Sequence, residues 1–170
     1  LGGLNAAQLD GLTSTQVAAL GTPQLAALTP TQIARLATSA VAGLTAADFA
    51  ALTNRQLAAL TSSQIGGLST TQLAQFTPTQ LAALSTTQIN GLTSTGVGVL
   101  AQTQLAALGT AQIRALSVAG ASGLSATQID GLALTQLGAL NTTEMAALST
   151  TALSGLSAET VGALSTTQLG

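Results

Sequence analysis

A leucine recurs at every eighth residue of this chain, and this spacing constrains the fold more than any other feature. Counting from Leu4 in steps of eight gives 21 first positions, of which 20 are Leu and one is Phe76. No insertion or deletion interrupts the series. Because ordinary surface loops tolerate insertions and deletions, an uninterrupted series indicates that each octad is one geometric step. We therefore interpret residues 1–170 as a single repeat array, and we expect it to be part of a longer protein because Leu1 begins in mid-pattern.

The polar positions of each octad predict the start of a helix. Position 2 is Ser, Thr or Asn in 16 of 21 octads, and position 5 is Gln in 14. Ser or Thr followed three residues later by Gln is the spacing of a capping box, in which each side chain hydrogen-bonds the other residue's backbone N–H. We predict helix capping at Thr29 with Gln32, at Thr53 with Gln56, and at Thr77 with Gln80.

Proline and acidic residues fit the same frame. Pro30 and Pro78 fall at the first helical position, where the missing N–H has no cost. Pro23 falls one residue later, and there either Gly21 or Thr22 is the cap. Asp48 and Glu144 replace Gln at position 5 and are interpreted as capping-box variants in the first turn, where the helix dipole favours a negative charge.

The apolar positions predict one continuous core. Position 6 is mostly Leu, Ile or Val and lies three residues before the next Leu, so the two share a helix face. Leu28 and Ile33 are also placed as a hydrophobic staple around the cap. Ala and Gly at positions 7 and 8 should let helices approach closely, and the outer surface is predicted to carry Thr, Ser and Gln. The predicted core residues are Leu28, Ile33, Leu36, Leu52, Leu57, Leu60, Leu84 and Ile89.

Three secondary structures compete for an eight-residue repeat. In one continuous α-helix the apolar positions would drift by about 80° per octad and form no stripe. In a β-solenoid positions 1 and 6 would face opposite sides, and the abundant Ala and Gln suit strands poorly. The third is a string of short helices, each covering roughly positions 3 to 8. We predict this all-α fold: an α-solenoid of about 21 eight-residue repeats, each one very short capped helix, around a continuous Leu/Ile/Val core.

Three octads depart from the rule. Leu36–Gly43 lacks the polar cap and the Gln, Leu92–Val99 has Gly96 in place of Gln, and Leu116–Gly123 has Gly120 there. These three departures have two possible explanations. One is sequence drift in a redundant array, and the other is a flexible segment or a contact groove. Neither Leu1–Gly3 nor residues 164–170 resemble a polar capping repeat, so both ends are expected to be open.

The composition argues against most kinds of chemistry. The chain has no Cys, His, Lys, Trp or Tyr, and its net charge is -2. Arg35, Arg55 and Arg114 are the only cations and lie far apart in sequence, so no nucleic-acid surface is expected. No His or Lys could activate a Ser or Thr nucleophile, and the acidic residues do not cluster. We predict no catalytic, cofactor-binding or metal site, and hence no enzyme.

No membrane-spanning helix is predicted, because polar clusters interrupt every apolar run well before about 18 residues. No signal peptide precedes the array within this sequence.

The consensus L-[ST]-x-[ST]-Q-[LIV]-A-[AG] resembles octapeptide repeats of large bacterial surface and secreted proteins, including adhesin-like ones. Octads that approach it are Leu20–Ala27, Leu52–Ala59, Leu60–Gly67 and Leu84–Gly91. The resemblance implies a short-repeat α-solenoid and an extracellular or cell-surface location. It names no protein or glycan partner.

Three functions remain open from the sequence. The first is a structural spacer, stalk or spring. The second is adhesion or self-association through the Ser/Thr/Gln face or an open end. The third is binding of ice or a polysaccharide by a regular Thr lattice, of which Thr13–Thr15, Thr29–Thr31 and Thr77–Thr79 are examples.

Overall fold

A computed structural model describes residues 6–170, so Leu4, which opens the first octad, lies outside the described residues. Within residues 6–170 there are 21 short helices and no strand. The helices are α1 (Ala6–Asp10), α2 (Ser14–Ala18), α3 (Thr22–Ala26), α4 (Pro30–Arg35), α5 (Thr38–Ala42), α6 (Ala46–Ala50), α7 (Asn54–Ala58), α8 (Ser62–Gly66), α9 (Thr70–Ala74), α10 (Pro78–Ala82), α11 (Thr86–Asn90), α12 (Ser94–Gly98), α13 (Gln102–Ala106), α14 (Thr110–Arg114), α15 (Val118–Ala121), α16 (Ala126–Asp130), α17 (Leu134–Leu137), α18 (Thr142–Ala146), α19 (Thr150–Ser154), α20 (Ala158–Ala163) and α21 (Thr166–Leu169).

Each octad contributes one helix and one bend. In the octad of α8 the N-cap Thr61 is extended (φ -77°, ψ 161°), and Gly67 at position 8 is the helical C-cap. Most helices therefore cover positions 3 to 7, one residue fewer than expected. Position 1 of the next octad and its N-cap then turn the chain. No described residue has a positive φ, so these bends need no left-handed glycine.

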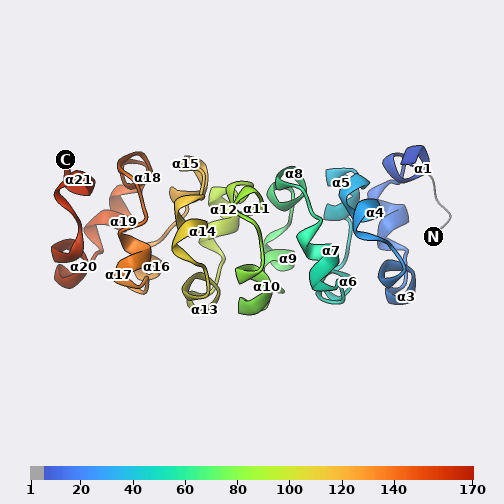
Figure 1. Cartoon of the computed structure of the whole chain (residues 1–170), viewed down its shortest axis with the longest axis horizontal. Coiled ribbons are helices and arrows are strands. Elements are labelled where there is room, and N and C mark those ends of the chain that lie inside the picture. Colours follow the sequence, from blue (N-terminus) through green and yellow to red (C-terminus); the bar gives the residue numbers. More distant parts are fainter. Residues whose placement is uncertain (1–5) are drawn as a thin grey trace.

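The helices stack in turns of three. α2 packs on α5, α5 on α8 and α8 on α11, and the same step of three helices recurs up to α18 on α21. One turn of the superhelix therefore takes three octads. The result is an elongated superhelix whose long axis runs from the N-terminal to the C-terminal end, as the colour gradient in Figure 1 shows. The predicted all-α solenoid of short capped helices is confirmed.

A single apolar core runs through the stack. Positions 1 and 6 of successive octads form one buried cluster from Leu9 to Ala152. Leu28, Ile33, Leu36, Leu52, Leu57, Leu60, Leu84 and Ile89 all belong to it, and none is more than 4% exposed. The two aromatic residues meet inside it: the rings of Phe49 and Phe76 lie edge to face with centroids 5.1 Å apart.

Glycine at position 8 permits the closest helix contacts. A Cβ atom on Gly91 would lie 2.2 Å from the carbonyl oxygen of Ser62, three octads earlier, and one on Gly123 would lie 2.0 Å from that of Ser94. Such distances are impossible for real Cβ atoms, so these positions require the absence of a side chain. The small residues at the octad end thus set the spacing of stacked helices.

The three irregular octads keep their helices. Thr93 and Ser117 still accept hydrogen bonds from the backbone N–H of Gly96 and Gly120. Ala37 begins α5 without any side-chain cap. The helix therefore tolerates loss of the position-5 glutamine, since neighbouring turns supply the packing.

Candidate functional site

The glutamines at octad position 5 form the recurrent polar feature of the interior. The expectation that they lie on the outer surface with Thr and Ser is wrong for most of them. Gln56 and Gln64 are each 2% exposed, and Gln72 is 1% exposed. A buried amide requires hydrogen-bond partners for both its oxygen and its nitrogen. The structure provides partners at both ends of the side chain.

Gln64 shows the arrangement. Its Oε1 accepts from the backbone N–H of Thr61 at 2.8 Å, which is half of the predicted capping box. Its Nε2 donates to the carbonyl oxygens of Ile33 at 2.9 Å and Leu36 at 2.6 Å, in the preceding turn. One side chain thus caps its own helix and ties that helix to the turn before it.

We call this pair of inter-turn hydrogen bonds a rung. Each rung joins a position-5 Nε2 to the carbonyl oxygens 31 and 28 residues earlier. The glutamines that form rungs are Gln56, Gln64, Gln72, Gln88, Gln104, Gln112, Gln128, Gln136 and Gln168.

Each rung reaches two carbonyls at the end of a short helix: one in the last turn, which also accepts from a backbone N–H, and one in the following bend. The last four C=O groups of any helix have no partner further along that helix, and in five-residue helices this is most of the backbone. Leu25 lies in the last turn of its helix and Leu28 in the following bend, and Gln56 donates to both carbonyls at 2.8 and 2.9 Å. At Leu28 the rung supplies a hydrogen bond that a longer helix would make internally, and at Leu25 it adds to the bond from the Leu28 N–H, at 3.0 Å.

The sequence carries a signal for this role that capping alone does not explain. A capping box accepts Glu as readily as Gln at its third helical position. Here Gln occupies 14 of 21 octads at this position and Glu only one. Such a bias indicates that an amide donor is required in addition to the oxygen.

The predicted capping residues all lie at helix N-termini. The hydroxyls of Thr29, Thr53 and Thr77 each accept from the backbone N–H three residues later. In return, the backbone N–H of each threonine donates to the side-chain oxygen of Gln32, Gln56 or Gln80. In α3 the N-cap is Gly21 and the helix begins at Thr22, which decides between the two caps considered above. Gly21 has no side chain, so only the bond from its N–H to Gln24 Oε1 remains.

Gln80 differs from its equivalents. Its Oε1 and backbone N–H make the capping box with Thr77, at 2.9 and 3.2 Å. In the register of the other rungs its Nε2 would face the carbonyls of Phe49 and Leu52, but no such hydrogen bond forms within residues 6–170. The Phe49–Phe76 pair occupies this part of the core. Gln80 is therefore a cap without a rung.

Glu144 occupies position 5, where most octads carry a glutamine, but an ionised carboxylate has no hydrogen-bond donor. It caps α18: its Oε2 accepts from the N–H of Asn141 at 2.8 Å, and the side chain is 2% exposed. Burial raises the pKa of this carboxyl above its ordinary value, against the lowering effects of Asn141 hydrogen bonds and the Arg114 charge. By the spacing of the other rungs, its second oxygen would face the carbonyls of Ile113 and Leu116, to which an ionised carboxylate cannot donate a hydrogen bond.

Asp130 provides a different connection between turns. Its carboxylate accepts from the backbone N–H of Ser157 at 3.1 Å and from the Ser157 hydroxyl at 3.2 Å. Ser157 is the N-cap of α20, where Thr160 stands in place of the usual Gln. Hydrogen bonds from Thr160 and Ser157 lower the pKa of Asp130. This aspartate thus caps a helix four octads further along the chain.

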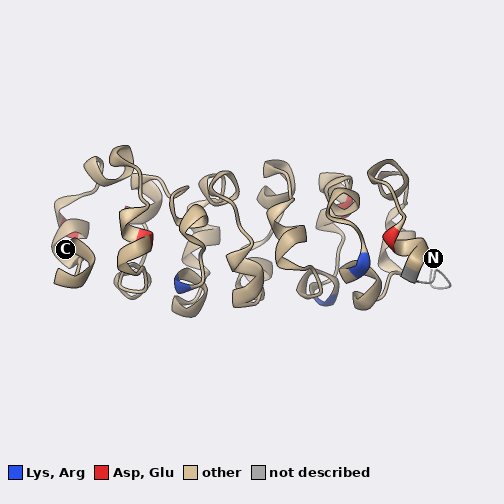
Figure 2. Ribbon diagram, turned by 90° about the horizontal axis from the view of Figure 1, so that it is seen from above, with Lys and Arg blue, Asp and Glu red and all other residues tan. Residues whose placement is uncertain are grey.

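The remaining charges are dispersed along the superhelix (Figure 2). Asp10 and Arg35 form an ion pair at 3.7 Å, but both side chains are half exposed, so the pair contributes little stability. Asp10 and Asp130 belong to octads that are fifteen repeats apart. Within residues 6–170 no group of three or more His, Cys, Asp or Glu side chains is placed to hold a metal ion. In the same residues no helix has the length and apolar character needed to cross a membrane.

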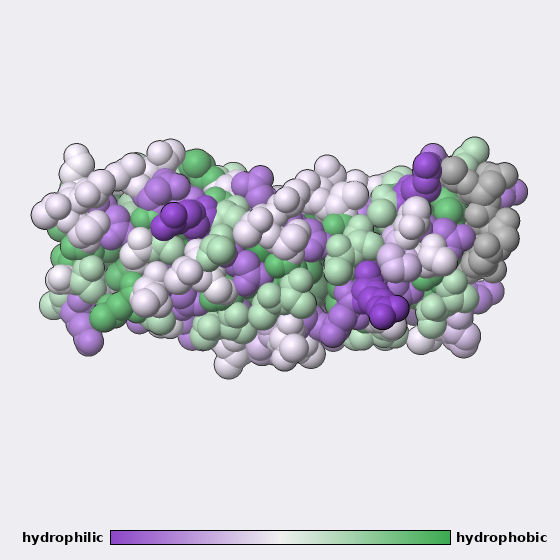
Figure 3. Space-filling model, viewed as in Figure 1, coloured by the Kyte–Doolittle hydropathy of each residue, from purple (hydrophilic) through white to green (hydrophobic). Residues whose placement is uncertain are grey.

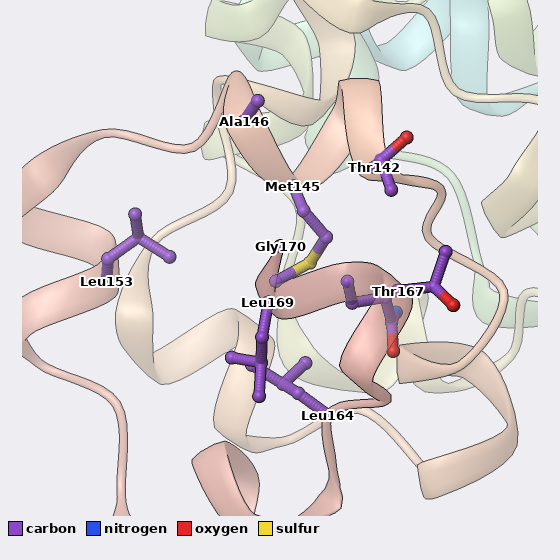
Figure 4. Close-up of a pocket in the computed structure, with 9 residues that line it drawn as sticks. Thr142, Met145, Ala146, Leu153, Leu164, Thr167, Leu169 and Gly170 are labelled. Atoms are coloured by element: carbon purple, nitrogen blue, oxygen red, sulfur yellow. The ribbon is translucent and has the colours of Figure 1, made fainter.

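An apolar hollow lies at the last turn of the array. Met145 of α18 points toward Leu164 and Leu169, as Figure 4 shows. The hollow has a volume of about 320 Å³. Leu169 is 61% exposed, whereas position-6 residues from Leu9 to Met145 are at most 5% exposed. Elsewhere, the face shown in Figure 3 has hydrophobic residues only in small separate groups between neutral and hydrophilic ones.

Comparison with known families gives a match for the N-terminal part of the chain. Residues 1–30, 17–54 and 41–78 match the family model of the ALTTAQ repeat. The first 78 residues are thus similar to the ALTTAQ repeat. No curated protein sequence matches the chain.

The ALTTAQ match supports a short repeat as the unit of the chain. Each matched segment is longer than 24 residues, which is the length of one turn of three octads. The matched part contains the complete rungs of Gln56, Gln64 and Gln72. Glu144 and Asp130 lie beyond it.

Proposed function

We propose that this chain is a non-enzymatic structural repeat region that serves as an elongated spacer, stalk or spring in a bacterial surface or exported protein. The observation that carries the proposal is the uniform step of the array. Every three octads add one turn along the same axis, and rungs satisfy the backbone between turns. The resemblance to octapeptide repeats of bacterial surface proteins supports the location, and the ALTTAQ match supports a repeat region.

The arrangement also suits a spring. Each turn contacts only its neighbours, so stability is approximately a sum of per-turn terms and opening can proceed turn by turn. Within residues 6–170 the glutamines that form rungs are engaged in caps and rungs, Gln102 Oε1 is a buried oxygen without a partner, and the charges are scattered.

The test is single-molecule extension of the chain between two handles. We expect a series of small unfolding steps, because one turn of 24 residues releases about 80 Å of extended chain. A variant in which residues 69–92 are duplicated should show one additional step of the same size. A single release of roughly 560–610 Å of extended chain, the value for all 170 residues, would contradict the spring.

A second candidate is self-association or adhesion, which the apolar hollow of Figure 4 favours. Leu164 and Leu169 line this hollow, which would suit a second apolar surface. Sedimentation over a concentration series should then show a rising mass, and Leu169→Ser should abolish the rise. Sedimentation as a monomer at all concentrations would exclude self-association through this end.

Binding of ice or a crystalline polysaccharide through exposed Thr residues is the third candidate. The Ser, Thr and Asn at position 2 are already used as caps, as at Thr61 and Thr77. This candidate is excluded if the chain shows neither thermal hysteresis nor retention on insoluble glycans.

A further inference from the structure

The rungs are not evenly distributed along the superhelix, and one full turn has none. α18, α19 and α20 make up three consecutive octads, hence one full turn, and carry Glu144, Ala152 and Thr160 at position 5. An ionised Glu has no donor and Ala has no polar side-chain atom. The Thr160 hydroxyl is bonded to Ser157 at 2.9 Å within its own cap. Among the octads from α7 to α21, this is the one full turn that has no rung to the turn before it.

The packing across the same boundary is also reduced. Ala121 occupies position 6 of α15, where most octads carry Leu, Ile or Val, and it lies in the helix on which α18 packs. Leu153 and Val161, at position 6 of α19 and α20, are 40% and 43% exposed and so bury less apolar surface than their equivalents. Two polar connections remain across this boundary. Asp130, which is exposed to solvent, accepts hydrogen bonds from Ser157 and Thr160. Gln168 of α21 donates one hydrogen bond to the carbonyl oxygen of Leu137 in α17, at 2.8 Å. A boundary with fewer hydrogen bonds and less buried apolar surface is easier to open.

We propose that the boundary between α14–α17 and α18–α20 is a built-in opening plane, at which the C-terminal turns detach as one unit before the other turns separate. The proposal concerns the order in which the array opens and does not depend on the spacer role. The rung-free turn sets this order because each other boundary between α7 and α17 retains at least one rung, such as those of Gln104, Gln112 and Gln136.

Hydrogen exchange of the whole chain, followed by mass spectrometry, tests this order. Amides in α18–α21 should exchange together, and faster than amides in α7–α11. Ala152→Gln places an amide in the register of the carbonyls of Ala121 and Leu124. We expect this variant to slow exchange of α18–α21 by roughly fivefold, as one net hydrogen bond would. Thr151→Gln is the matched control, because it adds the same side chain at an exposed position of the same helix and should leave exchange unchanged.

A double variant should create a second opening plane nearer the N-terminus. The octads of α13–α15 have rungs only from Gln104 and Gln112, because Gly120 has none. Gln104→Ala combined with Gln112→Ala should therefore create a second rung-free turn, so that α13–α21 exchange faster as a unit. Gln80→Ala removes a cap without a rung and controls for the loss of capping.

Equal exchange rates in α18–α21 and α7–α11 of the unmodified chain would overturn the proposal. So would an Ala152→Gln variant that exchanges like Thr151→Gln. If Ala152→Gln does not fold, Glu144→Gln serves instead with the same expected slowing, because it restores a donor opposite Ile113 and Leu116 without changing side-chain size.

Discussion

At the scale of single residues, the glutamine of position 5 links local structure to the superhelix. Its oxygen completes a capping box that depends on residues three apart. Its nitrogen reaches carbonyls 28 and 31 residues away, as Gln88 does to Leu60 and Leu57 at 2.8 Å. Removing the side chain therefore weakens two levels of structure at once.

We expect Gln64→Ala to lower the free energy of unfolding more than Gln80→Ala. Both substitutions remove half of a capping box, but only Gln64 also donates to two buried carbonyls. The difference should be about 1–3 kcal/mol, because a net hydrogen bond contributes about 0.5–1.5 kcal/mol. Urea titrations of both variants provide the measurement, and equal losses would show that the rung adds nothing to the cap.

Glu144 predicts a pH dependence with a defined sign. Its pKa is raised by burial in the folded chain, so the folded state takes up a proton before the unfolded state does. Its contribution to stability is fully present below the ordinary pKa of 4.5 and is lost as the pH rises through the folded-state pKa. Glu144→Gln should remove this dependence and, through a new rung, stabilise the protein at pH 7 by about 1–2 kcal/mol.

The charge of Arg114 opposes this effect, but Arg114 is exposed and its contribution should be small. Glu159→Gln removes one negative charge from an exposed position and is the matched control. Asp130 acts in the opposite direction: its pKa is lowered, so its contribution is lost as the pH falls below 3.8. The two windows are separate, and urea midpoints measured from pH 3 to pH 7 distinguish them. A Glu144→Gln variant with an unchanged pH profile would contradict this assignment.

At the scale of one helix, much could be predicted because the signals are local. Thr53, three residues before Gln56, is enough to locate the start of α7, and Pro78 fixes the first residue of α10. The rungs could not be predicted in the same way. The carbonyls that accept a rung depend on how many octads make one turn of the superhelix. The number of octads per turn follows from the angle of the bend between helices, and no single residue type in the repeat determines that angle.

Gly91→Ala should destabilise the array by about 1–3 kcal/mol, as overpacking does elsewhere. The new methyl group would meet the backbone of Ser62, which cannot move without shifting α8. Gly162→Ala in α20 is the control, because nothing lies within 4 Å of its added methyl group. That substitution should stabilise the helix by up to about 1 kcal/mol. Thermal melting of both variants tests the prediction, and a Gly91→Ala variant at least as stable as the unmodified chain would rule out close approach as the reason for this glycine.

At the scale of the whole molecule, the array should tolerate changes that respect its period. Deletion of residues 68–91 removes three octads and joins Gly67 to Leu92, so caps, core and rungs keep their register. We expect this variant to retain its helical circular dichroism signal per residue and to melt at a slightly lower temperature, since it has one turn fewer.

Deletion of residues 68–87 is the comparison, because 20 residues are not a multiple of eight. It would place buried positions next to capping positions at the junction and misalign the rungs across it. We expect a loss of helical signal around the junction. Equal signals per residue in the two deletion variants would show that the octad is not the structural unit.

The direction of the rungs has a consequence for how the chain is made. Every one runs from a later octad to carbonyls already in place behind it, as from Gln136 back to Leu108 and Leu105. During synthesis, each segment that leaves the ribosome therefore brings its own donors to a finished acceptor surface. The emerging chain can fold in the order in which it is translated, with each completed turn acting as the template for the next.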